Sequence, residues 1–483
     1  MNRIMLFYPP GKKYLRGEDR CQGNVDASSA TSMRACNDLG YAAAILKKSN
    51  YSIFLRDYQS KGLSMETLYN DIMEFKPDMI LVSTTNATVF SDIEIVSEIK
   101  RMRQSLIVVL KGAIFYNADI KMLKKFDFSY VDFLIGGEIE SSIGKIADYS
   151  LRKIGRVEDI PNIFYIQSNE KIIKTYFGYW ENDLDSIPFP AREYMDNTLY
   201  VRPDTGEPMA TIQVSRGCPG KCIYCLTPVI SGNKVRFRSP QNVIEELQEC
   251  YKKYNIYNFF FKADTFTINK EWVIELCTLI MESDLNGKIR FTANSRVKPL
   301  DKKALHYMRK AGCFMIAFGF ESGSERTLKR IKKEIKISDC MKAVRWTKDE
   351  GILTYGFYMI GFPWENRDDI KKTEKLIYSL NTDFIEIHIP EPFYGTELFE
   401  EAKKDKVLKK DIFGTDYFKP AILGTRYVTL EELIKIRKKI LFKYYFRRQY
   451  IIRRLKECKG NFFLFKSYLK YAVRLLKNVI KAD

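Results

Sequence analysis

The sequence predicts an α/β fold in three successive parts: a doubly wound sheet, a parallel (β/α)6 partial barrel and a helical C-terminal region. Two observations carry this prediction. Short apolar runs, typical of strands buried on both faces, alternate with helical patterns of about 10–15 residues in two separate series. A proline-rich stretch separates the two series, and 483 residues are too many for one ordinary domain.

The first series covers residues 1–150. Apolar runs predict strands at 3–8, 53–57, 79–83, 106–111 and 133–135. Helical patterns lie between them, at 33–48, 64–75 and 92–103. This alternation predicts parallel βαβ units in a doubly wound sheet, where ligands bind beyond the C-terminal ends of the strands.

Residues 151–204 are expected to be a connector, because the segment 185–190 (DSIPFP) contains prolines that exclude a regular element. The second series fills residues 205–425. Its predicted strands lie at 211–214, 259–262, 290–294, 316–320, 354–360 and 384–389. Six parallel strands suit a barrel or a partial barrel. Residues 426–483 are expected to form a basic, aromatic helical tail.

The positive charge of the chain is concentrated in this tail. The segment 427–483 has 16 Lys and Arg against 4 Asp and Glu, which is +12 of the chain's +19. Three roles are compatible with this composition: a helical cap over the active site, contact with an anionic membrane surface, and binding of RNA through stacked aromatics. The cap is the default and nucleic acid is the least favoured.

The apolar runs of the sequence are all shorter than a membrane-spanning helix requires. No apolar run reaches the roughly 18–20 residues required, and the apolar part of the N-terminal segment is too short for a signal peptide. We therefore expect a cytoplasmic protein, with peripheral membrane contact through residues 427–483 as one role of the tail.

Three of the ten cysteines lie close together, in a C-x3-C-x2-C arrangement formed by Cys218, Cys222 and Cys225. Clustered cysteines in an intracellular chain indicate metal or redox chemistry rather than disulfides. Three thiolates can hold three irons of a [4Fe–4S] cluster and leave the fourth iron open to a substrate. A structural zinc site would need a fourth ligand, and the only histidines, His306 and His388, lie far along the chain.

This loop after a first barrel strand resembles that of the radical S-adenosylmethionine enzymes, and the resemblance covers about residues 205–400. It implies a partial TIM barrel that cleaves S-adenosylmethionine at the open iron into methionine and a 5′-deoxyadenosyl radical. It also implies an electron donor of the flavodoxin or ferredoxin type. Further segments at strand ends fit the family pattern, namely 262–267 (KADTFT), 294–296 (NSR), 319–323 (GFESG) and 356–365 (GFYMIGFPWE).

The resemblance implies cofactor contacts for three residues near the start of the barrel. Tyr224 would pack near adenine, with an ordinary core aromatic as the alternative. Arg296 would pair with the methionine carboxylate through its planar guanidinium, with a salt bridge at the barrel rim as the alternative. Asp264 stands where the family often has a Gly-Gly-Glu segment that contacts the methionine amino group. This chain departs from that segment, so the resemblance gives less support to such a contact for Asp264.

The resemblance implies four further contacts at later strand ends. Glu321 and Ser322 would face the ribose and methionine parts of S-adenosylmethionine, and the backbone around Gly356 and Gly361 would surround adenine. No catalytic residue beyond these ligands is assigned.

A doubly wound domain before such a barrel resembles the Rossmann-like domain of the cobalamin-binding subgroup, and the strand end Gly136-Gly137-Glu138 agrees with it. Many cobalamin domains carry an Asp-x-His-x-x-Gly motif whose histidine ligates cobalt, whereas this chain has no histidine before His306. Cobalamin is therefore expected to bind without a protein imidazole. The alternative is a domain that serves only as a lid.

With cobalamin, the resemblance implies methylation of an unactivated carbon in a small-molecule or lipid substrate. Cyclisation or rearrangement by the same architecture is one alternative. An RNA-modifying methylthiotransferase is another, but that group usually carries three further cysteines in its N-terminal domain, where only Cys21 and Cys36 occur. A non-catalytic sensing protein is disfavoured by the intact cysteine loop.

Overall fold

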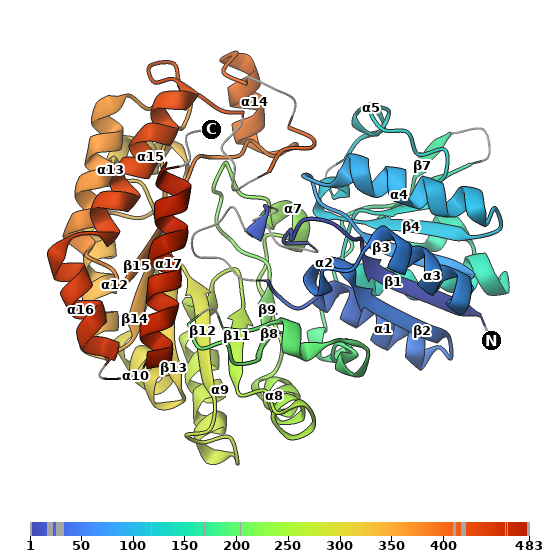
Figure 1. Cartoon of the computed structure of the whole chain (residues 1–483), viewed down its shortest axis with the longest axis horizontal. Helices are drawn as coiled ribbons and strands as arrows, with labels where there is room; N and C mark the ends of the chain where they lie inside the picture. Colours follow the sequence, from blue (N-terminus) through green and yellow to red (C-terminus); the bar gives the residue numbers. More distant parts are fainter. Residues whose placement is uncertain are drawn as a thin grey trace.

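A computed structural model describes residues 2–16, 23–25, 33–116, 118–167, 171–202, 204–408, 412–416, 422–458, 460 and 462–480. Two sheets lie side by side, each with helices around it, and three helices follow at the end of the chain (Figure 1). The predicted α/β fold class is confirmed. Cys21 lies outside the described residues.

The N-terminal sheet has seven strands in the order β2-β1-β3-β4-β5-β6-β7. The first five in sequence are parallel: β1 (Arg3–Tyr8), β2 (Ser52–Asp57), β3 (Met79–Ser83), β4 (Ile107–Lys111) and β5 (Phe133–Ile135). The helices α1 (Asn37–Lys48) and α6 (Ile143–Ala147) pack on one face of this sheet. The other face is covered by α2 (Tyr58–Lys61), α3 (Met65–Phe75), α4 (Val89–Met102) and α5 (Ile120–Leu123). Both faces are therefore buried, as the apolar strands predict.

This sheet continues into the segment that was expected to be a connector. The strands β6 (Ile163–Ile166) and β7 (Ile172–Lys174) add antiparallel to β5. Antiparallel strands need only a short turn between them, so no helix separates this pair and the β-helix-β pattern does not reveal it. The rest of the segment, up to Tyr200, consists of short turns and single helical turns.

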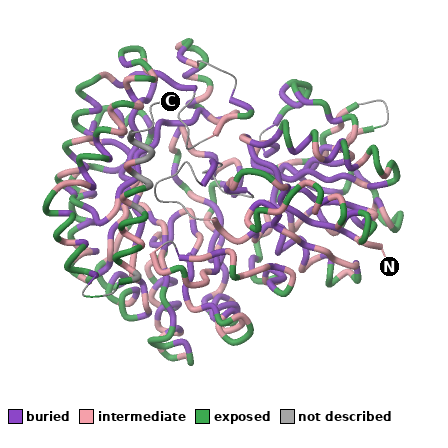
Figure 2. Tube along the Cα trace, in the orientation of Figure 1, coloured by how far each residue is buried: buried purple, intermediate pink, exposed green. Residues whose placement is uncertain are grey.

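The second sheet has six parallel strands in the order β15-β14-β13-β12-β11-β8. They are β8 (Met209–Gln213), β11 (Asn258–Lys262), β12 (Arg290–Ser295), β13 (Cys313–Glu321), β14 (Leu353–Met359) and β15 (Phe384–His388). The strands β8 and β15 are the two edges, so this barrel is open. Its outer helices are α8 (Pro240–Tyr254), α9 (Lys270–Glu282), α10 (Lys302–Lys310), α11 (Glu325–Arg330), α12 (Ile337–Asp349) and α13 (Arg367–Leu380). The interior of both sheets is buried (Figure 2).

Short elements join these parts. The strands β9 (Ser215–Arg216) and β10 (Arg236–Phe237) form a small antiparallel hairpin, with α7 (Thr227–Ser231) between them. The helix α14 (Glu397–Lys404) follows the last barrel strand. The cysteine loop therefore lies between β9 and α7, close to the end of β8.

The C-terminal region consists of α15 (Leu430–Tyr445), α16 (Arg448–Cys458) and α17 (Phe462–Ile480). The Tyr445 hydroxyl accepts a hydrogen bond from the Ile385 amide at 2.8 Å and donates one to the Ile385 carbonyl at 2.6 Å. These bonds cover the open edge of β15, whose backbone groups would otherwise be unpaired. The tail is helical as predicted, and its first helix closes the edge of the partial barrel.

Candidate active site

The three cysteines lie on a loop that bends sharply at Gly217, where φ is 90°. A Cβ at this position would collide with the Lys234 carbonyl, so the loop requires glycine here. All three thiols are half-buried. Backbone amides approach two of the sulfurs, from Gly220 to Cys218 and from Thr227 to Cys225, each at 3.4 Å. Such amide contacts stabilise thiolates and tune the potential of a bound cluster.

Asp264, at the end of β11, holds this loop in place. Its Oδ2 accepts a hydrogen bond from the Gly217 amide at 3.1 Å, and its Oδ1 accepts one from the Thr227 hydroxyl at 3.1 Å. Both carboxylate oxygens therefore bond to the segments on either side of the cysteines. Asp264 therefore lies at the site, and its hydrogen bonds stabilise the cysteine loop.

A cavity of about 240 Å³ opens beside the cysteine loop at the C-terminal ends of the barrel strands. Four of the seven residues predicted to contact the cofactor line it together with the three cysteines, namely Tyr224, Asp264, Arg296 and Glu321. The Tyr224 ring packs against Phe362 with 5.9 Å between the ring centroids. Phe362 thus brings the segment 356–365 into contact with Tyr224, the predicted adenine contact.

The other three predicted residues lie behind the cavity wall. Phe357 and Met359 of β14 line the cavity, so the alternation of a strand turns Gly356 to the opposite face. The Ser322 hydroxyl is buried 3.1 Å from the Thr373 hydroxyl. The Gly361 amide donates to Glu365 Oε2 at 2.8 Å. These residues support the strand ends and do not line the cavity.

Two cations and one carboxylate meet near Cys222. Lys333 Nζ lies 2.7 Å from Glu321 Oε1, and both side chains are buried. Burial opposes the charge of Lys333, but Glu321 and Cys222 raise its pKa overall. The Arg296 guanidinium donates to the Lys333 carbonyl at 2.8 Å. Burial raises the pKa of the Cys222 thiol, while Lys333 and Arg296 act in the opposite direction.

Sequence reasoning missed several residues that line this cavity. Arg34 and Lys262 add positive charge, and Lys333 and Glu391 bring ionisable groups from distant segments. Glu391 follows the last barrel strand, and burial raises its pKa to about 7. Lys262 belongs to the segment 262–267, but its motif assigned it no role. Arg34, Lys333 and Glu391 lie outside the segments that fit the family pattern, and the fold brings them to the cysteines.

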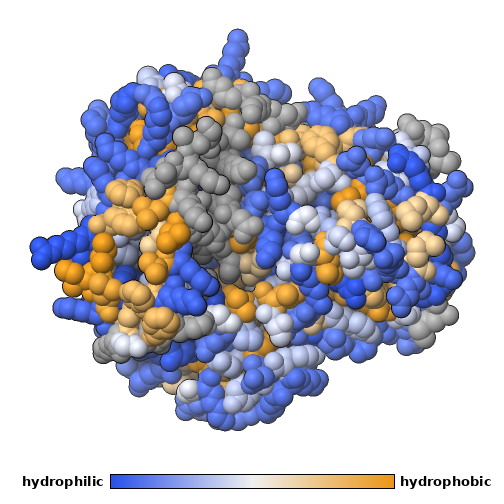
Figure 3. All heavy atoms as spheres, viewed as in Figure 1, coloured by the Kyte–Doolittle hydropathy of each residue, from blue (hydrophilic) through white to orange (hydrophobic). Residues whose placement is uncertain are grey.

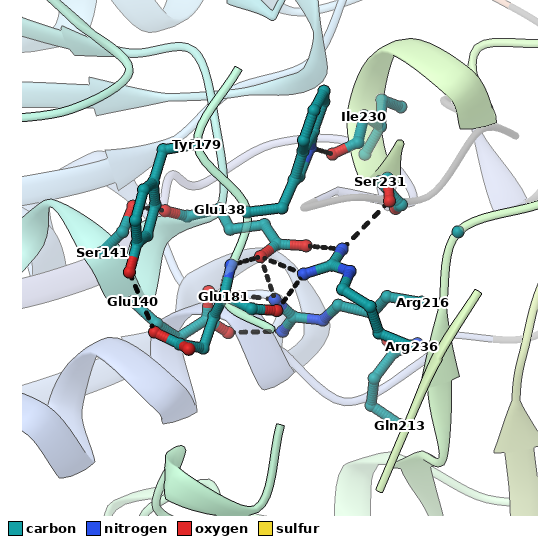
Figure 4. Close-up of polar contacts among 12 residues, drawn as sticks. Glu138, Glu140, Ser141, Tyr179, Glu181, Gln213, Arg216, Ile230, Ser231 and Arg236 are labelled. Atoms are coloured by element: carbon teal, nitrogen blue, oxygen red, sulfur yellow. Dashed lines mark hydrogen bonds and ion pairs between the residues drawn. The ribbon is translucent and has the colours of Figure 1, made fainter. Parts of the chain in front are cut away.

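Buried charges join the N-terminal domain to the hairpin beside the cysteine loop. Arg236 of β10 pairs with Glu138 at 2.6 Å, and Arg216 of β9 pairs with Glu140 at 2.5 Å and with Glu138 at 3.4 Å. Figure 4 shows both guanidinium groups pointing at the two carboxylates, with the Glu181 backbone amide donating to Glu138. Arg216 directly precedes Gly217, so this network fixes one end of the cysteine loop against the other domain.

The cysteine loop suits a cluster of several irons better than a single metal ion. Within the described residues, no three His, Cys, Asp or Glu side chains are placed to hold a single metal ion. A cubane cluster places each thiolate on a different iron, so three cysteines around one cavity suit a cluster better than one ion. At the domain interface, Asn37 Oδ1 and Ser215 Oγ are buried without a hydrogen-bond partner among the described residues, which suits a polar ligand between the domains.

The glycines that follow β4 and β5 do not leave a cradle for such a ligand. A Cβ at Gly112 would collide with Thr84, and one at Gly136 with the Phe115 carbonyl. These glycines therefore serve close packing within the domain. A cobalamin would be held at the domain interface by polar groups, with no imidazole from this domain.

The radical SAM superfamily model matches residues 212–377. An uncharacterized methyltransferase of Pyrococcus horikoshii is 26% identical over 90% of this chain and 93% of that protein. An anaerobic magnesium-protoporphyrin IX monomethyl ester cyclase of Cereibacter sphaeroides is 24% identical over 86% of this chain and 70% of that protein.

Among solved structures, the cobalamin-dependent S-adenosylmethionine radical enzyme OxsB with aqua-cobalamin bound aligns with a TM-score of 0.72. The alignment covers 99% of this chain and 72% of that chain at 14% identity. This likeness extends over both sheets and the C-terminal helices, so it supports the fold of the whole chain.

Proposed function

Because this chain is a radical S-adenosylmethionine enzyme of the subgroup that carries a cobalamin-binding domain, we propose that it methylates an unactivated carbon of a small-molecule or lipid substrate. The observation that carries the proposal is the cavity, where Cys218, Cys222 and Cys225 face two cations at the ends of parallel strands. Ligands of such sheets bind at this edge.

The three cysteines would hold the [4Fe–4S] cluster. Arg296 and Lys333 are the groups suited to the carboxylate of S-adenosylmethionine, because a buried anion needs an opposite charge. Tyr224 would contact adenine and Glu321 the ribose. Ser322, Gly356 and Gly361 would act from behind the wall by holding the strand ends, and Asp264 by holding the cysteine loop.

When bound, the cluster would supply the one-electron reduction of S-adenosylmethionine, and cobalamin would supply the methyl transfer. An electron donor of the flavodoxin or ferredoxin type would provide the electron. The chain's part is to place these groups around one cavity and to exclude water from it. Glu391 lies far from the cysteine loop in sequence but lines the same cavity. Its carboxyl is a candidate contact for the substrate.

Cyclisation is the second candidate, because a relative that spans most of this chain is named a cyclase. Both activities need the same cluster, so methyl transfer to cobalamin distinguishes them. Protein loaded with reduced cobalamin is incubated with S-adenosylmethionine labelled in its methyl group. We expect label in methylcobalamin, and an unlabelled cobalamin would rule out methylation while leaving S-adenosylmethionine cleavage in place.

The radical chemistry itself is tested on the anaerobically reconstituted protein. Wild type should bind about four irons and form 5′-deoxyadenosine from S-adenosylmethionine under reduction. The variants Cys218→Ala, Cys222→Ala and Cys225→Ala should each lose this product. Cys340→Ala, in the buried face of α12, is the matched control and should retain it. Retention of the product by the three loop variants would overturn the proposal.

A further inference from the structure

The outer surface of the C-terminal helices carries an apolar patch that the proposed function does not use. On α17, Phe462, Phe465, Leu469 and Val473 are 75%, 40%, 53% and 43% exposed. At about 100° per residue, their spacing places all four within an arc of about 80° on one side of the helix. We call these four residues the tail stripe. Figure 3 shows hydrophobic atoms gathered over α16 and α17.

The neighbouring helix extends this apolar surface. Ile451, Ile452 and Leu455 of α16 are 40%, 41% and 52% exposed. The inner side of the same helix is anchored to the barrel through Arg454, which pairs with Asp383 at 2.9 Å. The apolar residues therefore do not serve the attachment of the tail to the barrel, because a separate set of contacts does so.

Basic residues flank the tail stripe. Lys456, Lys466 and Lys470 are exposed, and within the described residues no acidic side chain pairs with them. The acid nearest to them in sequence, Glu457, pairs with Arg454 at 2.8 Å. The face thus combines exposed apolar side chains with unneutralised positive charge, on the segment that carries +12 of the chain's +19.

We propose that this face docks on an anionic lipid surface, with the tail stripe entering the headgroup region and the lysines pairing with lipid phosphates. An amphipathic basic helix that lies in the membrane plane has this composition. Within the described part of the chain, every helix is too short or too polar to span a bilayer. The contact is therefore peripheral.

The other candidate partners fit this face less well. Single-stranded nucleic acid is held by aromatic rings stacked on bases, whereas the stripe and its neighbours are mainly aliphatic. A second copy of the chain would bring two strongly basic faces together, which electrostatic repulsion opposes. Among the described residues, none after Phe393 lines the cavity, so the exposed face of α16 and α17 is not part of its wall.

The test is co-sedimentation of the full-length, reconstituted protein with vesicles. Vesicles of phosphatidylcholine and phosphatidylglycerol in equal parts should carry the protein down, and phosphatidylcholine vesicles should not. The variant Lys466→Gln/Lys470→Gln removes two charges near the surface and should bind about thirtyfold more weakly. The variant Phe465→Ser/Leu469→Ser should bind at least tenfold more weakly.

Matched controls replace exposed lysines and exposed apolar residues on the N-terminal domain. Lys121→Gln/Lys124→Gln alters two exposed lysines, and Met73→Ser/Met102→Ser alters two side chains that are 59% and 53% exposed. Both should bind as wild type does. Because the tail does not line the cavity, all four variants should form 5′-deoxyadenosine at the wild-type rate, which separates this test from that of the proposed function.

Three outcomes would overturn the proposal. The first is failure of the wild type to sediment with anionic vesicles. The second is equal weakening in the tail and control variants. The third is evidence that the face binds another partner. Such evidence would be a wild-type dimer that Phe465→Ser/Leu469→Ser dissociates, or single-stranded RNA that displaces the vesicles.

Discussion

At the scale of the residue, the feature that distinguishes the site is the pair formed by Glu321 and Lys333. Glu321 has φ 62° at the end of β13, where the register with β14 shifts, and this conformation is costly for a residue with a side chain. The turn directs its carboxylate into the cavity, where Lys333 Nζ lies at 2.7 Å. A strained backbone next to a buried ion pair indicates that position matters more here than stability.

Replacing Lys333 by Met should therefore weaken the binding of S-adenosylmethionine and also lower the stability of the fold. We expect the dissociation constant of S-adenosylmethionine to rise at least tenfold, because a buried carboxylate loses a cationic partner. The unfolding free energy should also fall by about 3–5 kcal/mol, since Glu321 is left buried and unpaired. Equilibrium dialysis and urea unfolding measure the two effects.

The neighbouring Lys332 supplies the control, because its side chain is 47% exposed and pairs with Glu397 away from the cavity. Lys332→Met should bind S-adenosylmethionine as wild type does. If Lys333→Met and Lys332→Met bind it equally well, Lys333 has no role in holding this molecule.

The second residue-scale prediction concerns pH. Burial raises the pKa of Glu391 to about 7, although the Thr415 hydroxyl donates to it at 2.8 Å and acts in the opposite direction. The folded protein therefore holds a proton that the unfolded chain releases near pH 4.5. This group makes the unfolding free energy fall as the pH rises from about 4.5 to 7.

Glu391→Gln keeps an acceptor for Thr415 and removes the titration. Its unfolding free energy relative to wild type should thus increase between pH 5 and pH 8, by on the order of 2–3 kcal/mol. Urea unfolding of the apo protein at both pH values measures the difference. A constant difference between the two proteins would show that Glu391 is ionised in the fold at both values.

At the scale of the element, local patterns predicted the parts of the fold that depend on local sequence. The six barrel strands and the five parallel N-terminal strands overlap the short segments from which they were predicted, and the structure contains each of them. The pair β6 and β7 escaped prediction because short antiparallel strands joined by a turn lack the helix that marks a parallel connection. The helices of the tail were predicted, but their docking along β15 depends on tyrosine contacts that no periodicity reveals.

The same limit applies to the site. The spacing of Cys218, Cys222 and Cys225 is local, so the sequence alone was enough to place them on one loop. Alternation along β14 decides that Phe357 faces the cavity and Gly356 does not, and this orientation was not read from the motif. Lys333 reaches Glu321 through the chain that follows α11, and the approach of two such segments is a property of the packed fold.

At the scale of the whole molecule, the two sheets are joined by buried charges rather than by apolar contact alone. Glu138 and Glu140 belong to the N-terminal domain, while Arg216 and Arg236 belong to the hairpin beside the cysteine loop (Figure 4). All four side chains are at most 5% exposed. Buried charges of this kind fix one arrangement, because any other would leave a charge unpaired.

Breaking this network should uncouple the two domains. Arg236→Met leaves Glu138 with the Glu181 amide and the longer contact to Arg216, at 3.4 Å, and should destabilise the interface by about 3–5 kcal/mol. In scanning calorimetry we expect one unfolding transition for wild type and two separate transitions for the variant. The double variant Glu138→Gln/Arg236→Met removes both charges and should recover much of the loss, since no unpaired carboxylate remains.

Arg156→Met is the matched control, because the Arg156 side chain is 73% exposed and its ion pair with Glu158 is on the surface. It should unfold as wild type does. The network also holds Arg216 next to Gly217, so a displaced interface should change the cluster as well as the stability. We therefore expect the electron paramagnetic resonance signal of the reduced cluster to change in Arg236→Met and not in Arg156→Met; a single calorimetric transition together with an unchanged signal in Arg236→Met would mean that the domains are held together by other contacts.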